Sequence, residues 1–213
     1  MQPRIVECKK CKTQPELKAL HNHCCWLWHI RAYYLGFWEN PGKTAMRLGN
    51  KGVVFFADLG EVVREYIMLQ MCRLMDPPET PIKGGPAENL TLKNLLKTLP
   101  LSSAVKSKVQ QKVNRMEEIC IPLREARNKI IAHMDKQTAL ANKSLGILKH
   151  HDEYQEWFDL LQDIVDEMHR DLHDDWPLPM VSAPAGGLDD LLVTLRSDWR
   201  RLDELDGKPE EVV

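Results

Sequence analysis

Hydrophobic residues recur every three or four positions along most of the chain, which is the spacing of one face of an α-helix. This pattern predicts helices over 15–38, 53–75 and 188–205, a short helix capped by Thr91, and a long helix after Ser102 or Ser103. The most regular stripe consists of Tyr154, Trp157, Phe158, Leu161, Ile164, Val165, Met168 and Leu172. Because Trp157 and Phe158 lie on this stripe, we expect both side chains in the core rather than on a surface that stacks RNA bases.

Two interruptions break this pattern. The segment 76–90 is rich in Pro and Gly, and it predicts a long loop that is either a family insertion or a functional lid. Pro122 lies inside the long helix and removes one backbone donor, so we expect a kink or a division there. No alternating segment is long enough to indicate a sheet, and the expected fold class is therefore an all-α bundle.

The pattern also predicts the domain organisation. We expect one helical domain over 1–176, followed by a linker over 177–187 that contains Pro and Gly. The last helix, 188–205, is expected to pack on the bundle, and 206–213 to form a flexible tail.

The composition is that of a globular protein, with 43% hydrophobic and 28% charged residues in a chain of 213. The apolar runs are too short to span a bilayer, and the first residues lack the pattern of a signal peptide. Six scattered cysteines do not resemble a secreted disulfide framework. We therefore expect a cytoplasmic protein with no membrane partner.

The net charge of -2 excludes binding of nucleic acid by overall charge, but the charges are distributed unevenly. Residues 1–100 carry 14 basic and 9 acidic side chains, 101–136 carry 8 and 4, and 137–213 carry 7 and 18. The basic segment could bind a polyanion next to its own counter-charge. Solvated helix faces that pair across the bundle explain the same distribution.

The segment 123–136 holds the first set of candidate functional residues. On a helical wheel of about 100° per residue, Arg127 falls near the centre of the apolar stripe through Leu123 and Ile130. His133 lies at the edge of that face. An arginine on an apolar stripe is costly unless it pairs with an acid of a neighbouring helix or faces a partner or ligand. The residues alone allow either explanation.

This segment resembles the signature of the HEPN superfamily, in which an Arg is followed, after four to six residues, by a His. Arg127, the polar residue Asn128, four further residues and His133 fit that signature.

The resemblance continues outside the motif. Phe55 and Phe56 begin a predicted helix whose end is followed by the acidic and proline residues of 73–78. The segment 89–92 comes next, together with Leu95 and Leu96. These features are similar to the AbiU branch of the superfamily, which is linked to phage abortive infection. The resemblance covers about 20–176. It implies an HEPN-like helical bundle with additional flanking helices.

In many HEPN proteins the motif belongs to a metal-independent ribonuclease, so the resemblance implies an RNA endonuclease of a phage-defence or toxin–antitoxin system. His133 would serve as general base and acid, because imidazole titrates near neutral pH. Arg127 would stabilise the phosphorane, and Asn128 would orient the histidine or hold a phosphate oxygen. Further phosphate contacts are predicted for Arg124, Lys129 and Lys136, although Lys129 also fits a solvated position. No cofactor is expected.

The alternative is a non-catalytic HEPN module that binds nucleotide or RNA, or docks another protein of a defence system. The intact Arg, Asn and His favour the enzyme, whereas the near-neutral net charge favours the binding module. The expected partners are RNA, a second copy of the chain, and an antitoxin or another defence protein.

The spacing of the motif raises a geometric problem. In a regular helix Arg127 and His133 are about 120° apart around the axis, so one helix cannot easily aim both at a single phosphate. Either the helix breaks near Ala132, or a two-fold axis brings a second copy of the motif opposite the first. We predict that activity requires this homodimer.

Two further sets contain possible metal ligands. Cys8 and Cys11 have the spacing of a zinc-binding pair that His21 and His23 could complete, but no second matched pair is present, so we expect zinc to be absent or dispensable. A third set, at 149–153 and 169–175, is rich in acidic residues and histidine. It could hold a metal, but a solvated helix end is the simpler explanation.

Overall fold

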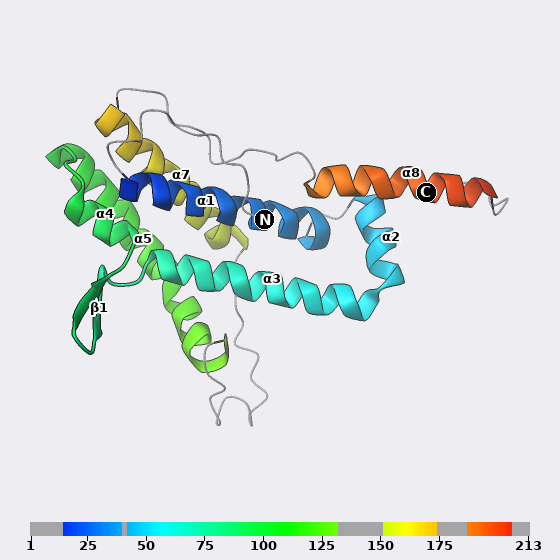
Figure 1. Ribbon diagram of the computed structural model, residues 1–213, viewed down its shortest axis with the longest axis horizontal. Coiled ribbons are helices and arrows are strands. Elements are labelled where there is room, and N and C mark those ends of the chain that lie inside the picture. The colour runs from blue at the N-terminus through cyan, green and yellow to red at the C-terminus, as the bar shows by residue number, and fades with distance from the viewer. Residues whose placement is uncertain (1–14, 40–41, 132–150, 174–186, 206–213) are drawn as a thin grey trace. The chain divides into compact units, whose positions relative to one another are not determined.

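The computed structural model describes residues 15–39, 42–131, 151–173 and 187–205 and is predominantly helical (Figure 1). This confirms the predicted all-α class. The helices are α1 (Pro15–Tyr34), η2 (Leu35–Glu39), α2 (Lys43–Lys51), α3 (Val53–Leu74), α4 (Leu92–Thr98), α5 (Ser103–Ala126), η3 (Arg127–Ile131), α7 (His151–His173) and α8 (Leu188–Leu205), of which η2 and η3 are π-helices. Within these ranges, no helix is long and apolar enough to cross a membrane.

The chain forms two compact units. Among the described residues, unit 1 contains 28–39, 42–64 and 187–205, and unit 2 contains 15–27, 65–131 and 151–173. The motif segment belongs to unit 2.

The core of unit 2 takes buried side chains from α1, α3, α4, α5 and α7, and α5 packs against α7. α5 begins at Ser103 because the hydroxyl of Ser102 accepts a hydrogen bond from the Val105 amide at 3.4 Å, which makes Ser102 the cap. Trp157 and Phe158 are fully buried, as predicted. The same two helices bury Val109, Val113, Met116, Cys120, Leu123, Leu161, Ile164, Val165 and Met168.

The helix that contains Pro122 is not divided. α5 continues through this residue to Ala126, so the predicted division is wrong. Pro122 is exposed, and its ring therefore lies on the solvent side rather than against the core. The regular α-helical pattern ends at Arg127 instead, where η3 begins.

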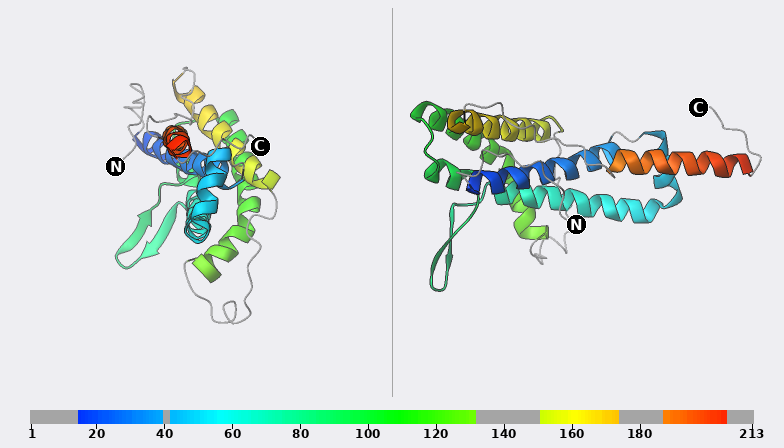
Figure 2. Two further views of the ribbon diagram at one scale, coloured as in Figure 1. Left: turned by 90° about the vertical axis from the view of Figure 1, so that its right-hand side faces the viewer. Right: turned by 45° about the horizontal axis from the view of Figure 1, so that its top comes forward.

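The segment 76–90 is not the long loop that its composition predicts. It contains an antiparallel hairpin of β1 (Glu79–Ile82) and β2 (Gly85–Glu88), visible in both views of Figure 2. Lys83 and Gly84 form its turn; Gly84 and Gly85, the first residue of β2, have φ of 116° and 125°, a region that favours glycine. With only four residues per strand and no alternation, the sequence carries little strand signal.

The prolines of this hairpin block its edges. Pro81 faces Pro86, and the Asn89 amide donates to the Pro78 carbonyl at 2.7 Å. Because bonded and non-bonded pairs alternate in an antiparallel ladder, Pro81 and Pro86 occupy a non-bonded pair whose N–H groups would point outwards. Each edge therefore lacks a donor that an added strand would need.

Unit 1 is built around aromatic side chains. Phe37 stacks on Phe56 with ring centroids 4.9 Å apart, and the Trp38 indole donates to the Phe56 carbonyl at 2.8 Å. The glycine at position 60 permits this close approach, because a Cβ there would lie 2.7 Å from the Trp38 Nε1. The sequence did not predict α2, which is short and contains Gly49.

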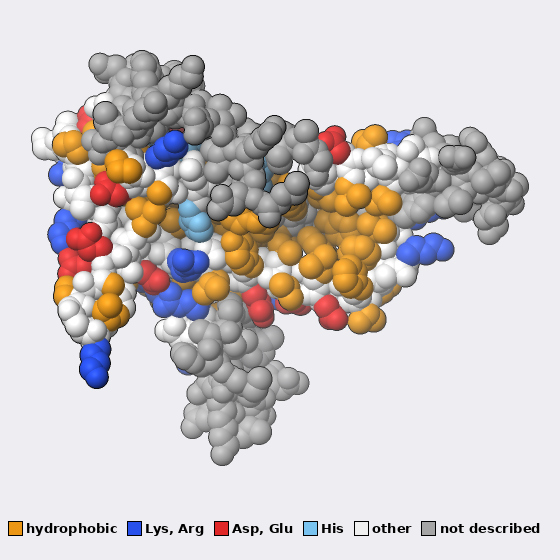
Figure 3. Space-filling model, viewed as in Figure 1, with side chains coloured by type: hydrophobic (Ala, Val, Ile, Leu, Met, Phe, Trp, Pro, Cys, Tyr) orange, Lys and Arg blue, Asp and Glu red, His pale blue; other side chains and the backbone are white. Residues whose placement is uncertain are grey.

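Many apolar side chains of unit 1 are nevertheless exposed. Figure 3 shows hydrophobic side chains gathered around the N-terminal half of α3. The exposed apolar residues of this unit are Met46, Val53, Val54, Phe55, Leu59, Val62, Leu191 and Val193.

Candidate active site

The motif begins at a change of helix type. α5 ends at Ala126, and Arg127 is the first residue of the π-helix η3. In a π-helix each hydrogen bond spans five residues rather than four, so the angle per residue is smaller than in an α-helix. The wheel that placed Arg127 and His133 about 120° apart assumed a regular α-helix. That assumption does not hold over Arg127–Ile131.

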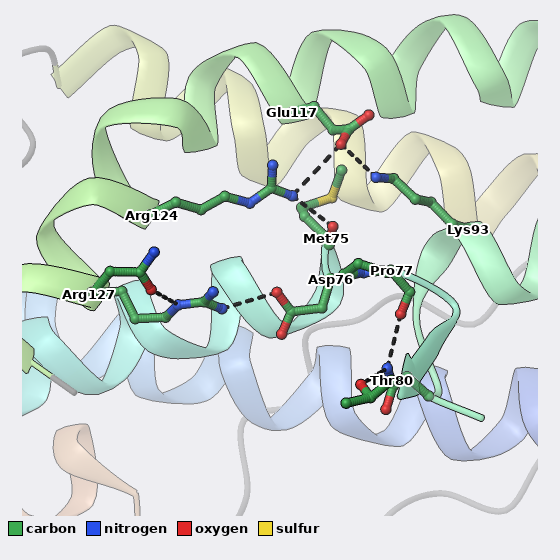
Figure 4. Close-up of polar contacts among 10 residues, drawn as sticks. Met75, Asp76, Pro77, Thr80, Lys93, Glu117, Arg124 and Arg127 are labelled. Atoms are coloured by element: carbon green, nitrogen blue, oxygen red, sulfur yellow. Dashed lines mark hydrogen bonds and ion pairs between the residues drawn. The ribbon is translucent and has the colours of Figure 1, made fainter. Parts of the chain in front are cut away.

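Arg127 is half-buried and engaged on two sides. Its Nη1 donates to Asp76 Oδ1 at 2.9 Å, and its Nε donates to Asn128 Oδ1 at 3.2 Å (Figure 4). The side chains of Arg127 and Asp76 are 22% and 30% exposed. Arg127 therefore pairs with an acid, as one of its two explanations requires, but Asp76 lies two residues after the end of α3 rather than on a helix.

Arg124 lies one turn before Arg127 and also contacts the end of α3. Its Nη2 donates to the Met75 carbonyl at 2.6 Å and lies 3.6 Å from Glu117 Oε1. A cation at this position satisfies a carbonyl that the helix leaves without an internal partner. Glu117 also accepts a hydrogen bond from Lys93 of α4. These contacts join α3, α4 and α5 at one point.

The other predicted site residues are placed as follows. Asn128 is exposed, and its carbonyl oxygen accepts from Arg127. Lys129 is exposed and pairs with Glu125 at 2.5 Å, one turn away. His133 and Lys136 lie outside the described residues. The structure therefore brings Arg127 and Asn128 together, and the role of His133 stays a prediction.

Two thiols lie near these arginines. Burial raises the pKa of Cys72 to about 11, although the charges of Arg127 and Arg124 act in the opposite direction. Burial likewise raises the pKa of Cys120 to about 12. Because the thiolate is the nucleophilic form, both cysteines are poor nucleophiles at neutral pH.

The candidate zinc ligands do not converge in the described part of the chain. His21 lies inside unit 2, where its Nε2 is 3.6 Å from Cys25 Sγ and its ring packs edge-on against His169. His23 is two positions further along α1 and therefore points elsewhere; burial, and then the charge of Arg73, lowers its pKa. Cys8 and Cys11 lie outside the described residues.

One residue of the third candidate set, Asp171, has a structural role. Asp171 accepts hydrogen bonds from the Ser102 amide at 2.6 Å and the Ser102 hydroxyl at 2.8 Å. This carboxylate therefore supports the cap of α5. Among the residues that the structure describes, no three His, Cys, Asp or Glu side chains lie close enough together to hold a metal ion.

Asp76 was not among the residues predicted for the site. It belongs to the string 73–78 that carries the AbiU resemblance, but nothing in a local pattern indicates that its carboxylate contacts a residue 51 positions further along the chain. The sequence shows only that this acidic residue is followed by two prolines, which indicates a turn and not a partner for Arg127.

The sequence model of the AbiU2 family of HEPN domains matches residues 10–185, a range that contains Asp76, Arg127 and His133. No curated protein and no solved structure matches the chain.

Proposed function

Because the chain belongs to the AbiU2 family of HEPN domains, which points to abortive infection systems, we propose that it is a metal-independent RNA endonuclease of a phage-defence or toxin–antitoxin system. The observation that carries the proposal is the placement of Arg127. Its guanidinium is held at the start of η3 next to Asn128, six residues before a histidine.

The proposed reaction is an internal transesterification of RNA. His133 removes the proton from a 2'-hydroxyl, whose oxygen attacks the adjacent phosphorus while the bond to the 5'-oxygen breaks. A protonated imidazole returns a proton to that leaving oxygen. The products are a 2',3'-cyclic phosphate and a 5'-hydroxyl, and neither water nor a cofactor is consumed.

Arg127 has an electrostatic part in this reaction. Negative charge accumulates on the phosphorane oxygens, and the guanidinium stabilises it with charge-assisted hydrogen bonds. Arg124, Lys129 and Lys136 add positive charge for neighbouring phosphates. Asn128, which accepts from the Arg127 Nε, orients the guanidinium in addition to its predicted role beside the histidine.

The reaction needs one imidazole as base and one imidazolium as acid. We propose that a homodimer supplies them, with one His133 from each protomer at a shared groove. An antitoxin or another defence protein would then regulate the enzyme by covering this groove.

The test is incubation of the purified chain with total RNA in the presence of EDTA. We expect cleavage with 2',3'-cyclic phosphate ends, and a loss of about a hundredfold or more in Arg127→Ala and in His133→Ala. Lys108→Ala is the matched control, because this lysine is exposed on α5, about five turns before the motif. Absence of cleavage, a strict requirement for magnesium, or full activity of His133→Ala would contradict the proposal.

Mixed dimers test the shared groove. Inactive Arg127→Ala and inactive His133→Ala chains are combined after unfolding and refolding together. Recovery of part of the wild-type rate supports a composite site. Full activity of a demonstrably monomeric wild-type chain would exclude it.

A further inference from the structure

Asp76 sits at the junction between α3 and the hairpin. Its backbone amide donates a hydrogen bond to the Arg73 carbonyl at 3.2 Å, and this bond forms a final turn at the end of α3. Pro77 and Pro78 follow, and each has a backbone φ fixed by its ring. The backbone on either side of Asp76 is therefore conformationally restricted.

The chain before Asp76 is held by α5. Arg124 donates to the carbonyl of Met75 at 2.6 Å, and Glu117 links Arg124 to Lys93 of α4. Figure 4 shows these side chains around the end of α3. A carboxylate attached to this point is fixed relative to α5, the helix that leads into the motif.

The chain after Asp76 is held by the hairpin. The side-chain Nδ2 of Asn89 donates to the Pro77 carbonyl at 2.9 Å and to the Thr80 hydroxyl at 2.7 Å. Asp76 thus lies between two anchored segments rather than in a free loop.

The contacts of Arg127 leave part of its guanidinium available. A guanidinium carries five N–H donors. The Asp76 carboxylate accepts a hydrogen bond from Nη1, and the Asn128 side-chain carbonyl accepts the hydrogen bond from Nε. Within the described ranges, no acceptor contacts Nη2. Two neighbouring acceptors therefore fix the plane of the group, while donors remain for a third acceptor.

We infer that Asp76 is a positioning residue of the site: its carboxylate holds Arg127 by Nη1 so that the remaining N–H groups face the phosphate of bound RNA. This inference rests on the proposed function. A long, flexible arginine side chain loses rotamer freedom when it binds a phosphate, and prior fixation by Asp76 removes part of that cost.

A carboxylate next to an arginine could also act in the opposite sense. If Asp76 occupied the place of the phosphate, its removal would strengthen RNA binding and raise the rate of cleavage. The sign of the change on removal of the carboxylate therefore separates positioning from competition.

The experiment compares Asp76→Ala with Asp76→Asn and with the control Glu79→Ala. Glu79 is also a carboxylate in an ion pair near the end of α3, but its partner is Lys97. Each chain is assayed for kcat and KM on RNA in EDTA. Binding is measured separately with random RNA oligonucleotides carrying 2'-methoxy groups, which cannot form the nucleophile.

We expect Asp76→Ala to lower kcat by about tenfold to a hundredfold, the effect of misplacing a catalytic group. Asp76→Asn keeps an acceptor oxygen and should retain more of the rate, whereas Glu79→Ala should equal the wild type. In an Arg127→Ala background, Asp76→Ala should cause no further loss, because it acts through the arginine. A merely structural role would instead lower the rate in both backgrounds.

The outcomes separate the inference from the proposed function. If the wild type cleaves RNA and Asp76→Ala cleaves as fast or faster, the inference is wrong and the proposed function stands. If the wild type binds but does not cleave, the proposed function is wrong. Equal loss of binding in Asp76→Ala and Arg127→Ala then still supports the inference, and unchanged binding overturns it. Absence of both binding and cleavage overturns both.

Discussion

The two halves of α3 are both rich in apolar residues, but these residues have different environments. In unit 2, Ile67, Met71 and Leu74 are no more than 2% exposed. In unit 1, Val54 and Phe55 are 73% and 64% exposed. In unit 1 one face of α3 packs against Phe37 and Trp38, and the exposed apolar residues lie on its other faces, so apolar character alone does not show which side chains are covered. The same contrast predicts how strongly each unit responds to mutation.

The largest effect is expected in the core of unit 2. Trp157→Ala removes a fully buried side chain and should lower the free energy of unfolding by about 3–5 kcal/mol. Phe55→Ala removes an aromatic side chain from the exposed face and should cost less than about 0.5 kcal/mol. Urea unfolding followed by circular dichroism measures both. Similar losses in the two variants would show that the comparison between the units is wrong.

A substitution should destabilise unit 1 clearly at the place where its aromatic side chains pack together. A methyl group at Gly60 would lie 2.7 Å from Trp38 Nε1, so Gly60→Ala must displace the indole and should cost about 1–3 kcal/mol. Gly49→Ala is the matched control, because no atom lies within 4 Å of its added Cβ. This variant should be more stable than the wild type by about 0.5–1 kcal/mol, owing to helix propensity. Thermal unfolding of both variants shows whether Gly60→Ala loses stability and Gly49→Ala gains it.

A smaller effect is expected at the cap of α5. Ser102→Ala removes the acceptor for the Val105 amide and one of the two donors to Asp171, and it should cost about 1 kcal/mol. Ser103→Ala, at the first residue of the same helix, should be close to neutral. Equal stability of the two variants in urea would contradict the assignment of Ser102 as the cap.

The smallest effect concerns the charge of one carboxylate in unit 2. Burial holds the pKa of Asp166 above its usual value in the folded protein. The folded state therefore binds this proton more tightly than the unfolded state, so stability falls as the pH rises from the usual pKa to the raised one. Asp166→Asn should be slightly more stable than the wild type at neutral pH and equal to it in acid.

Asp159→Asn provides the control for that measurement. Both carboxylates accept a hydrogen bond from a glutamine one turn earlier, Gln155 for Asp159 at 2.8 Å and Gln162 for Asp166 at 2.7 Å. Asp159 is exposed, whereas Asp166 is half-buried. Stabilisation that is the same in both variants, or that persists in acid, would exclude burial of the Asp166 charge as the cause.

The amino-acid sequence by itself determined the helical class and most helix boundaries. Thr91 and Ser102 are caps, and each acts on an amide three positions later, so their effect is readable from neighbouring residues. The buried face of α7 was equally predictable, because Trp157 and Phe158 lie on a regular stripe. The Arg127 and His133 motif also depends only on local spacing, and it indicated the family.

The tertiary structure decided what each of these local features contacts. Arg127 needed an acidic partner or a ligand, and the sequence contains 31 acidic residues with no local rule to choose among them. The approach of the end of α3 to the end of α5 selects Asp76, which is 51 positions away, and the same approach gives Arg124 the carbonyl of Met75. Local patterns depend on propensity over a few residues, whereas an ion pair between distant segments depends on how whole helices pack.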